Sequence, residues 1–442
     1  MAIEQTSRLA GDSLVGKTAP ADRTGAPLAY SPSLKLFVFA LFFAFGGITS
    51  LNDILVPKLK SLFTLSYADG MLVQSAFFAA YFVISLPAAA LVRRIGYLHA
   101  AAVGLLTMTA GCLLFVPASS FGVFGLFLFA LFVLAAGITT VQVVANPLIS
   151  MLGPPATASS RLTFAQAFNS LGTTLFPFFG SILILGSLAA ETSTGATHVL
   201  STQFRSAETR VIVHTYFGLA VALCVLAVAV WMQRGSLSEA PRSNTPILRA
   251  FGLLRQPRFA FGTLCIFLYV GGEVAIGSLI VNYLIQPDVF GGAAKQAGEH
   301  VPYYWGGAMV GRFIGAYVLR LISPGKVLAT VASVVILLLI ISANSTGFVS
   351  GWSLLAIGLF NSIMFPTIFS LASEGLGPRA AEGSGVIAMA IVGGAIVPLL
   401  TGFAADSWGL KLALAVPAVC YVGILLFGWF ARRPLNAVVA ST

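Results

Sequence analysis

Long apolar runs dominate this chain, and the polar stretches between them are short. A helix needs about 20 mostly apolar residues to cross the hydrocarbon layer of a membrane. Twelve such stretches lie between Leu34 and Phe430, and none shows the short alternation of a membrane β-barrel. They predict an all-α membrane protein with twelve transmembrane helices, at approximately 34–56, 69–92, 98–117, 121–150, 162–187, 211–232, 258–286, 302–322, 326–344, 350–373, 384–403 and 410–430.

A basic connection divides these predicted helices into two groups of six. The stretch from Gln233 to Arg258 carries five arginines and is the longest polar connection after the N-terminal tail. The pattern therefore predicts five parts of the chain. They are a disordered cytoplasmic tail at 1–33, six-helix bundles at 34–232 and 258–432, a cytoplasmic linker at 233–257 and a cytoplasmic tail at 433–442, all within one membrane-spanning unit.

The two groups of helices resemble each other. Residues 74–100 and 303–329 have equal length and align with a glycine at 96 and 325, and the later proline pair Pro177 and Pro398 follows an LGP tripeptide in each group. Such repeats are found in transporters whose halves are related by a pseudo-two-fold axis, with the substrate site near the midplane between them. We therefore expect two similar bundles around a central site.

The composition supports a membrane protein and explains the positive charge. Apolar residues make up 58% of the chain and charged residues only 9%, whereas soluble domains have roughly a quarter charged residues. Of the 24 basic residues, 17 fall on the side of the two termini and six on the other side, with Arg312 inside a span. This asymmetry predicts that both termini are cytoplasmic. The net charge of +10 is then a topology signal and indicates no nucleic acid partner.

Several chemical classes find no support in the sequence. The four cysteines lie far apart inside apolar runs, and the four histidines lie in or beside loops, so neither a disulfide framework nor a metal site is indicated. No GxxxxGK[ST], GxSxG or HExxH motif is present. We expect neither an ATP-driven pump nor an enzyme, and no cofactor.

Three charged residues stand well inside predicted spans: Asp53, Glu273 and Arg312. A charge at the bilayer centre costs about 2.5–3.5 kcal/mol on insertion scales, so such residues usually face a cavity or a partner. For Glu273 and Arg312 we consider a structural ion pair between two helices and a role in coupling equally. The glycines at 307, 311 and 315 beside Arg312 predict close helix packing rather than ligand binding.

Asp53 lies where an apolar run should continue. One interpretation is that Asp53 is exposed to water at the outer end of its helix and forms an ion pair with Lys58 or Lys60. The interpretation that we prefer is a broken helix, because Pro57 removes a backbone donor and Gly46-Gly47 precede the site. Irregular backbone at membrane depth lines a cavity, where a carboxylate can bind a hydroxyl group or a proton.

Polar side chains form stripes on two further predicted helices. Thr139, Gln142, Asn146 and Ser150 share one helical face, as do Thr163, Gln166, Ser170 and Thr173. Such groups can simply bond neighbouring helices, but two adjacent stripes indicate a polar wall that suits a many-hydroxyl solute. The second half adds Asn282, Gln286 and Asn361, and aromatic residues able to stack on a sugar ring, although most of these are expected to be packing residues: Phe77, Tyr81, Tyr269, Tyr304, Trp305 and Phe365.

Longer motifs carry a family resemblance. The segments "NDILVPKLK", "GITTVQVVANPLISMLGP", "SSRLTFAQAFNSLGTT" and "YWGGAMVGRFIGA" closely resemble the fucose permease family of the major facilitator superfamily, and within it the glucose/galactose transporter branch. The similarity extends from about Phe37 to Arg432. It implies the major facilitator fold and proton-coupled import of a glucose- or galactose-type hexose across a bacterial inner membrane.

The resemblance also assigns roles to residues. It implies that Asp53 is the coupling carboxylate of the first helix and that Gln166 contacts the sugar, while a second family carboxylate is replaced here by Gln142, which cannot titrate. We expect Asp53 or Glu273 to carry the proton and Arg312 to be an ion-pair partner. The expected sugar-binding residues are Asn52, Asp53, Gln142, Asn146, Gln166, Asn169, Asn282 and Asn361.

Other functions remain open on the sequence alone. Gln142 favours a hexose uniporter, and the sugar could instead be fucose, mannose or N-acetylglucosamine. An efflux antiporter for lipophilic compounds would need a mostly apolar cavity, which the amide stripes argue against. A sugar receptor without transport is a further alternative. We expect a monomer in a lipid bilayer.

Overall fold

The computed structural model describes residues 32–63, 67–184, 202–234, 246–292 and 294–433. Every one of the twelve predicted ranges contains a helix or a helix pair, and nine of the helices in the described ranges are long and apolar enough to span a membrane. The predicted all-α class is therefore confirmed. The first half contains α1 (Pro32–Phe63), α2 (Tyr67–Ile95), α3 (Tyr97–Phe121), α4 (Phe124–Met151), the short η1 (Pro155–Thr157), α5 (Ala158–Ile184) and α7 (Thr202–Met232).

The second half has shorter pieces. It contains α8 (Pro257–Leu284), α9 (Ala294–Gly298), α10 (Val301–Leu321), α11 (Pro324–Asn344), α12 (Gly347–Asn361), α13 (Met364–Ala372), η3 (Gly377–Arg379), α14 (Ala380–Met389), η4 (Ala390–Val392), α15 (Gly393–Trp408), α16 (Leu410–Ala413) and α17 (Ala415–Phe430). Two of the predicted spans are thus interrupted near their middles, between α12 and α13 and between α14 and α15.

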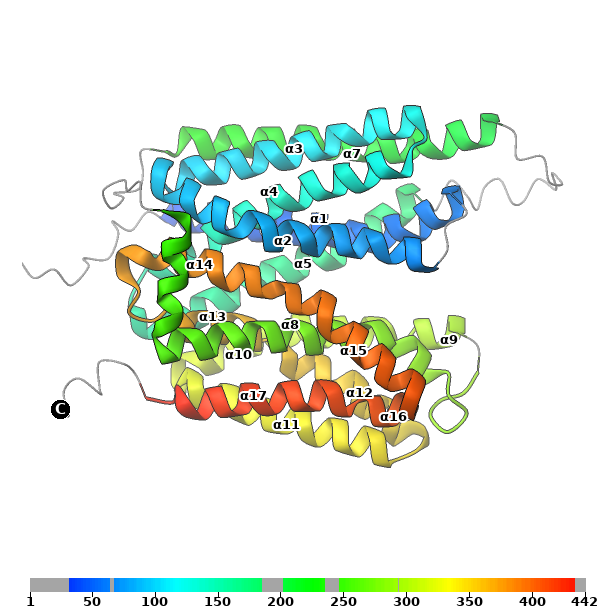
Figure 1. Cartoon of the computed structure of the whole chain (residues 1–442), viewed down its shortest axis with the longest axis vertical. Helices are drawn as coiled ribbons and strands as arrows, with labels where there is room; N and C mark the ends of the chain where they lie inside the picture. The colour runs from blue at the N-terminus through cyan, green and yellow to red at the C-terminus, as the bar shows by residue number, and fades with distance from the viewer. Residues whose placement is uncertain (1–31, 64–66, 185–201, 235–245, 293, 434–442) are drawn as a thin grey trace, which may run out of the picture.

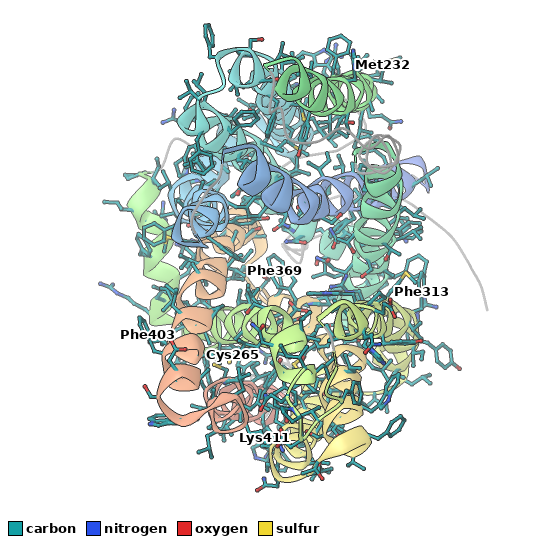
Figure 2. The ribbon with its side chains drawn as sticks, turned by 90° about the vertical axis from the view of Figure 1, so that its right-hand side faces the viewer. Met232, Cys265, Phe313, Phe369, Phe403 and Lys411 are labelled. Carbon is teal, nitrogen blue, oxygen red and sulfur yellow. The ribbon has the colours of Figure 1, made fainter. Side chains whose placement is uncertain are left out.

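The two halves form two layers of roughly parallel helix axes (Figure 1). Contacts between the layers come mainly from α2 and α4 with α14, and from α5 with α10 and α13. Seen along the helices, Met232 and Lys411 lie at opposite edges of the molecule (Figure 2). Helices α2 and α17 end on the same side of the molecule, and we call this side the Arg93 end. Helices α9 and α16 lie on the opposite side, which we call the Lys411 end.

The helix break predicted near Asp53 is wrong, because α1 continues as one helix from Pro32 to Phe63. The two glycines before it serve packing instead. A Cβ at Gly46 would overlap Asn169, and a Cβ at Gly47 would overlap the ring of Phe176, both on α5. These glycines therefore let α1 and α5 approach closely, and the single hydrogen bond that Pro57 removes does not end the helix.

The break between α12 and α13 lies at the middle of the second half. Pro366 has no N–H, so the carbonyl of Ser362 four residues earlier cannot be paired within the helix. Helix α10 packs against this break through its glycine stripe: Gly307 faces Leu359, and a Cβ at Gly311 would overlap the Leu359 carbonyl. The stripe predicted to serve helix packing does so.

The linker between the halves contains a short helix that the sequence did not predict. Helix η2 (Ile247–Arg255) lies across the Arg93 end of the bundle and contacts α2, α8 and α14 (Figure 1). Its residues Ala250 and Leu253 are buried, and the Arg379 guanidinium donates to the carbonyl of its Arg249 at 3.1 Å. The linker therefore touches both halves. The predicted tails fall almost wholly outside the described residues.

The packing of α10 yields the first prediction. Gly311→Ala should lower the free energy of unfolding by about 1–3 kcal/mol, because the added methyl group overlaps the backbone of α12. Gly306→Ala is the matched control on the same helix, since a Cβ there meets open space. Thermal unfolding of the purified protein in detergent measures both, and equal transition temperatures would show that this close approach is not required.

Candidate functional site

Arg312 lies in the middle of α10 and bonds to both halves of the molecule. Its Nε donates to the Ser362 carbonyl at 3.3 Å, which is the carbonyl that Pro366 leaves without a helical partner. Its Nη1 donates to the Gln166 carbonyl at 3.1 Å and to the Ser170 hydroxyl, both on α5. The guanidinium is therefore satisfied by neutral oxygens, and one side chain joins the two halves at mid-depth.

Glu273 belongs to a second polar cluster, which lies within the second half. The Tyr269 hydroxyl donates to Glu273 Oε1 at 2.8 Å and lies 3.0 Å from the Asn361 carbonyl. Asn361 Nδ2 donates to the Tyr304 hydroxyl at 2.9 Å. Tyr269, Tyr304 and Asn361 are all buried. The cluster joins α8, α10 and the last residue of α12, next to the helix break.

The anticipated ion pair between Glu273 and Arg312 does not form. Among the described residues the ion pairs are Arg93–Glu382, Arg379–Glu382, Arg258–Glu374 and Lys411–Asp288. The Arg312 guanidinium instead donates to the carbonyls at the α12–α13 break and on α5, so it forms none of these ion pairs.

The polar stripe of α4 divides into two kinds of residue. Thr139 and Ser150 donate to carbonyls of their own helix, at 2.8 and 2.9 Å. In contrast, Gln142 Oε1 and Asn146 Oδ1 are buried and have no hydrogen-bond partner in the part of the chain that the structure describes. The same is true of Thr163 Oγ1 on α5. Buried polar atoms are normally bonded, so these three oxygens are candidates to receive a ligand or water.

The remaining predicted residues have different surroundings. Gln166 is buried, and Asn169 donates to the Phe42 carbonyl on α1 at 3.3 Å. Asn282 is exposed and lies nine residues from Glu273, which places it on the opposite face of α8. The structure does not bring it to the Glu273 cluster. Asn52 and Asp53 lie on α1, but their side chains are outside the described residues.

The aromatic candidates mostly pack within the protein, as expected. Tyr81 is buried, with its ring 5.5 Å from that of Phe77, and the Phe365 ring lies 6.4 Å from Tyr269. Trp305 is 47% exposed and contacts Tyr304 edge-on. Tyr269 and Tyr304 contribute hydroxyl groups to the Glu273 cluster rather than open stacking faces.

Sequence reasoning missed the residues that hold the halves together at the Arg93 end. Glu382 on α14 accepts from Arg93 of α2 at 2.6 Å and from Arg379 at 2.7 Å, and its side chain is only 5% exposed. Ser159 donates to Ser370 at 2.9 Å between α5 and α13. Glu382 falls just outside the predicted span 384–403, so it is not among the charged residues that the pattern places inside the membrane. Its position four residues after the second LGP proline was the available signal.

A second contact at the same end involves α5 and α10. The Ser160 hydroxyl donates to the Ala316 carbonyl at 2.6 Å and accepts from Arg320 Nε at 3.3 Å. Between α2 and α14, a Cβ at Gly385 would overlap Ala89 and the Ser85 carbonyl. The halves are therefore closely packed from the Arg93 end to the level of Arg312. No group of three or more metal-ligating side chains occurs in the described ranges.

Comparisons with known proteins identify what this arrangement resembles. The profile of the Major Facilitator Superfamily matches residues 37–391. A glucose/galactose transporter of Brucella abortus is 49% identical over 89% of this chain and 92% of its own length. The L-fucose-proton symporter of Escherichia coli K12 is 33% identical over 89% and 92%.

A solved structure agrees with the fold. The transporter FucP in the outward conformation matches with a TM-score of 0.78 and 30% sequence identity, covering 90% of this chain and 99% of that one. These matches confirm the family resemblance and the two-bundle fold predicted from the sequence.

The bonds of Arg312 yield the second prediction. Arg312→Lys should destabilise the protein by about 1.5–3 kcal/mol, because an ammonium group cannot reach acceptors on α5 and at the α12–α13 break together. Arg320→Lys is the matched control, since this exposed residue on the same helix makes one long bond. Thermal unfolding compares the two, and an equal loss in both would contradict a special role for Arg312.

Proposed function

Because this chain belongs to the Major Facilitator Superfamily and is a multi-pass membrane transporter rather than an enzyme, we propose that it imports a hexose together with a proton by alternating access. Its relatives include a glucose/galactose transporter and an L-fucose-proton symporter. The observation that carries the proposal for this chain is a pair of buried amide oxygens on α4, Gln142 Oε1 and Asn146 Oδ1, that have no partner among the residues that the structure describes.

Those oxygens suit a sugar for a physical reason. A carboxamide offers acceptors and donors together, and a hexose offers several hydroxyl groups that need both. Burying such an amide without a partner costs about 1–3 kcal/mol, and a bound sugar would recover that cost. Gln142, Asn146 and Gln166 lie on α4 and α5 of the first half, and we assign the main sugar contacts to them, with Asn52, Asp53 and Asn169 completing the site.

The second half contributes differently. Its polar groups Tyr269, Glu273, Asn361 and Tyr304 are bonded to one another, and of the Asn361 amide only Oδ1 has no partner among the described residues, so this cluster can offer a sugar one acceptor. We propose that Asn361 positions the other side chains of this cluster. Asn282 lies on the opposite face of α8 and is exposed, so we do not assign it a place in the cluster. The halves then move relative to each other, with the sugar held mainly by the first half.

The direction of opening follows from the packed end. In the proposed orientation both termini and the Arg93 end are cytoplasmic in a bacterial inner membrane, as the distribution of basic residues favours. The ion pairs of Glu382 and the bonds of Ser159 and Ser160 close that side. This state therefore binds sugar from outside, and release into the cytoplasm requires these contacts to separate.

Asp53 is the proposed proton carrier, since Gln142 cannot titrate. A proton that crosses with the sugar at about 150 mV contributes roughly 3.5 kcal/mol, enough for several hundred-fold accumulation. The same Gln142 favours the second candidate, a uniporter that equilibrates hexose without a proton. We further propose that the protein acts as a monomer in the bilayer.

Uptake of labelled hexoses by proteoliposomes tests this function. With a pH gradient, glucose or galactose should accumulate, and Asp53→Asn should abolish accumulation while sugar exchange continues, because the amide still binds hydroxyl groups. Asp406→Asn is the control, since this carboxylate near the end of α15 is exposed and belongs to none of the ion pairs among the described residues. Accumulation that survives in Asp53→Asn would remove Asp53 from coupling, and flux insensitive to collapse of the gradient would support the uniporter.

The closed end generates a separate prediction. Glu382→Gln should open the cytoplasmic side, because it removes a buried carboxylate that joins Arg93 and Arg379. A cysteine introduced at buried Ala89, in a chain with exposed Cys224 replaced by Ala, reports this opening. Its reaction with a membrane-impermeant maleimide in inside-out vesicles should accelerate about tenfold or more, since 1.4 kcal/mol changes a population tenfold.

The control for that experiment carries the same charge change. Glu374→Gln removes the partner of Arg258, but both residues belong to the second half. Its labelling rate should match that of the parent chain. If both variants label equally fast, loss of charge at this end explains the opening and the pairing between halves does not.

A further inference from the structure

A cavity lies at the Lys411 end of the second half, away from the contacts between the halves. Its volume is about 430 Å³, which falls in the range of small-molecule sites. The rings of Phe290, His300, Phe348 and Trp352 surround it, and Gln296 and Glu299 supply polar groups. These residues come from the segment between α8 and α10 and from the first turns of α12.

The rings form one connected aromatic wall. The Phe290 centroid lies 5.0 Å from His300 and 6.4 Å from Phe348, and Trp352 lies 5.6 Å from Phe348 and 6.1 Å from His300. His300 Nδ1 is bonded to the Gln296 carbonyl at 2.9 Å, which fixes the ring and leaves Nε2 for a ligand. Gln296 and Glu299 are exposed at the edge of the cavity.

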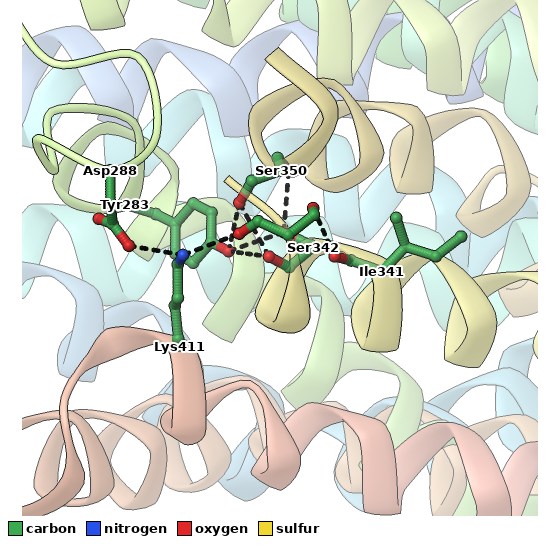
Figure 3. Close-up of polar contacts among 7 residues, drawn as sticks. Tyr283, Asp288, Ile341, Ser342, Ser350 and Lys411 are labelled. Atoms are coloured by element: carbon green, nitrogen blue, oxygen red, sulfur yellow. Dashed lines mark hydrogen bonds and ion pairs between the residues drawn. The ribbon is translucent and has the colours of Figure 1, made fainter. Parts of the chain in front are cut away.

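A bonded frame holds the two sides of the cavity in place. Gly351 on α12 has no Cβ, so the ring of Phe290 packs directly on it. The Gly347 amide donates to the Asp288 carbonyl at 2.8 Å. Lys411 lies 2.5 Å from the Asp288 carboxylate and donates to the Ser345 carbonyl at 2.8 Å (Figure 3). The loop that carries Phe290 is thus tied to α12 and to α16.

Deeper in the frame, side chains of α8, α11 and α12 are joined. The Tyr283 hydroxyl lies 2.8 Å from the Ser342 carbonyl and 2.9 Å from the Ser350 hydroxyl (Figure 3). The hydrogen bond from Lys411 holds the pKa of Asp288 below its usual range. The ion pair therefore persists at neutral pH and is lost only as the pH falls through that lowered value. The cavity walls are held in position before any ligand arrives.

We infer that this cavity is a second carbohydrate site that takes a hexopyranose before it enters the centre of the transporter. A pyranose has an apolar C–H face and a polar edge. Aromatic rings that form a wall can cover that face, and carboxamide, carboxylate and imidazole groups at the rim can bind the hydroxyl groups. The identity of the ligand rests on the proposed function, and in the proposed orientation the cavity opens to the outside.

Trp352 provides a direct probe of this site. In a full-length chain with Trp231, Trp305, Trp408 and Trp429 replaced by Phe, D-glucose or D-galactose should change the Trp352 emission in a saturable way. Sorbitol, which has the hydroxyl groups but no ring face, should not. A chain that keeps only Trp408, an exposed residue at the same end, is the matched control and should respond to neither compound.

Gln296→Ala tests the polar rim without disturbing the aromatic wall, since Gln296 is exposed. Loss of one hydrogen bond should raise the Kd for hexose, measured by titration of the Trp352 emission, by about fivefold. In otherwise native protein it should raise the KM of uptake and leave kcat unchanged. No Trp352 response to either hexose, or an equal response to sorbitol, would overturn the inference.

Measurements of transport and of binding distinguish the second-site proposal from the proposed function. Hexose uptake without a Trp352 response would retain the transporter and reject the second site. A saturable Trp352 response in protein that transports no hexose would retain the site and reject the proposed function. An Asp53→Asn chain should still give the Trp352 response, because this cavity is built by the second half alone.

Discussion

The guanidinium of Arg312 is the constraint on which the centre of this structure depends. A charge at this depth must be surrounded by acceptors, and the chain supplies them from both halves: the Ser362 carbonyl, the Gln166 carbonyl and the Ser170 hydroxyl. Pro366 leaves the first of these free, and the glycine at 311 lets α10 approach it. Any movement of one half against the other must exchange these hydrogen bonds for new ones. The free-energy cost of burying the Arg312 charge therefore enters the transport cycle.

The two halves use their polar side chains in different ways. In the second half, Tyr269, Glu273, Asn361 and Tyr304 are bonded to one another around the helix break, and Asn361 Oδ1 alone among their bonded groups has no partner in the described ranges. In the first half, Gln142 and Asn146 keep buried oxygens without partners in the described ranges. The central polar side chains of the second half are therefore linked to one another, whereas Gln142 and Asn146 on α4 of the first half are not.

The contacts between the halves gather at one end. Glu382 with its two arginines, and Ser159 and Ser160 with their partners, all lie toward the Arg93 end. Helix η2 crosses that same end and touches both halves (Figure 1). Polar bonds of this kind can be exchanged for water when the end opens, whereas a large apolar contact could not separate at a comparable cost. The aromatic cavity at the Lys411 end is built by one half and can persist through such a movement.

The sequence by itself determined the spans, their class and the packing role of Gly311, because a bilayer demands apolar length and close helix approach demands a missing Cβ. It did not determine which helix breaks. Pro57 and Pro366 are the same local signal, and Pro87, Pro117, Pro147 and Pro398 also lie inside helices. At the α12–α13 break, the carbonyl freed by Pro366 accepts from Arg312, and this bond depends on how α10 packs against α12. Likewise, only the tertiary structure decided that Arg312 bonds neutral oxygens instead of Glu273, because the distance between groups on different helices is set by packing and not by their spacing in the chain.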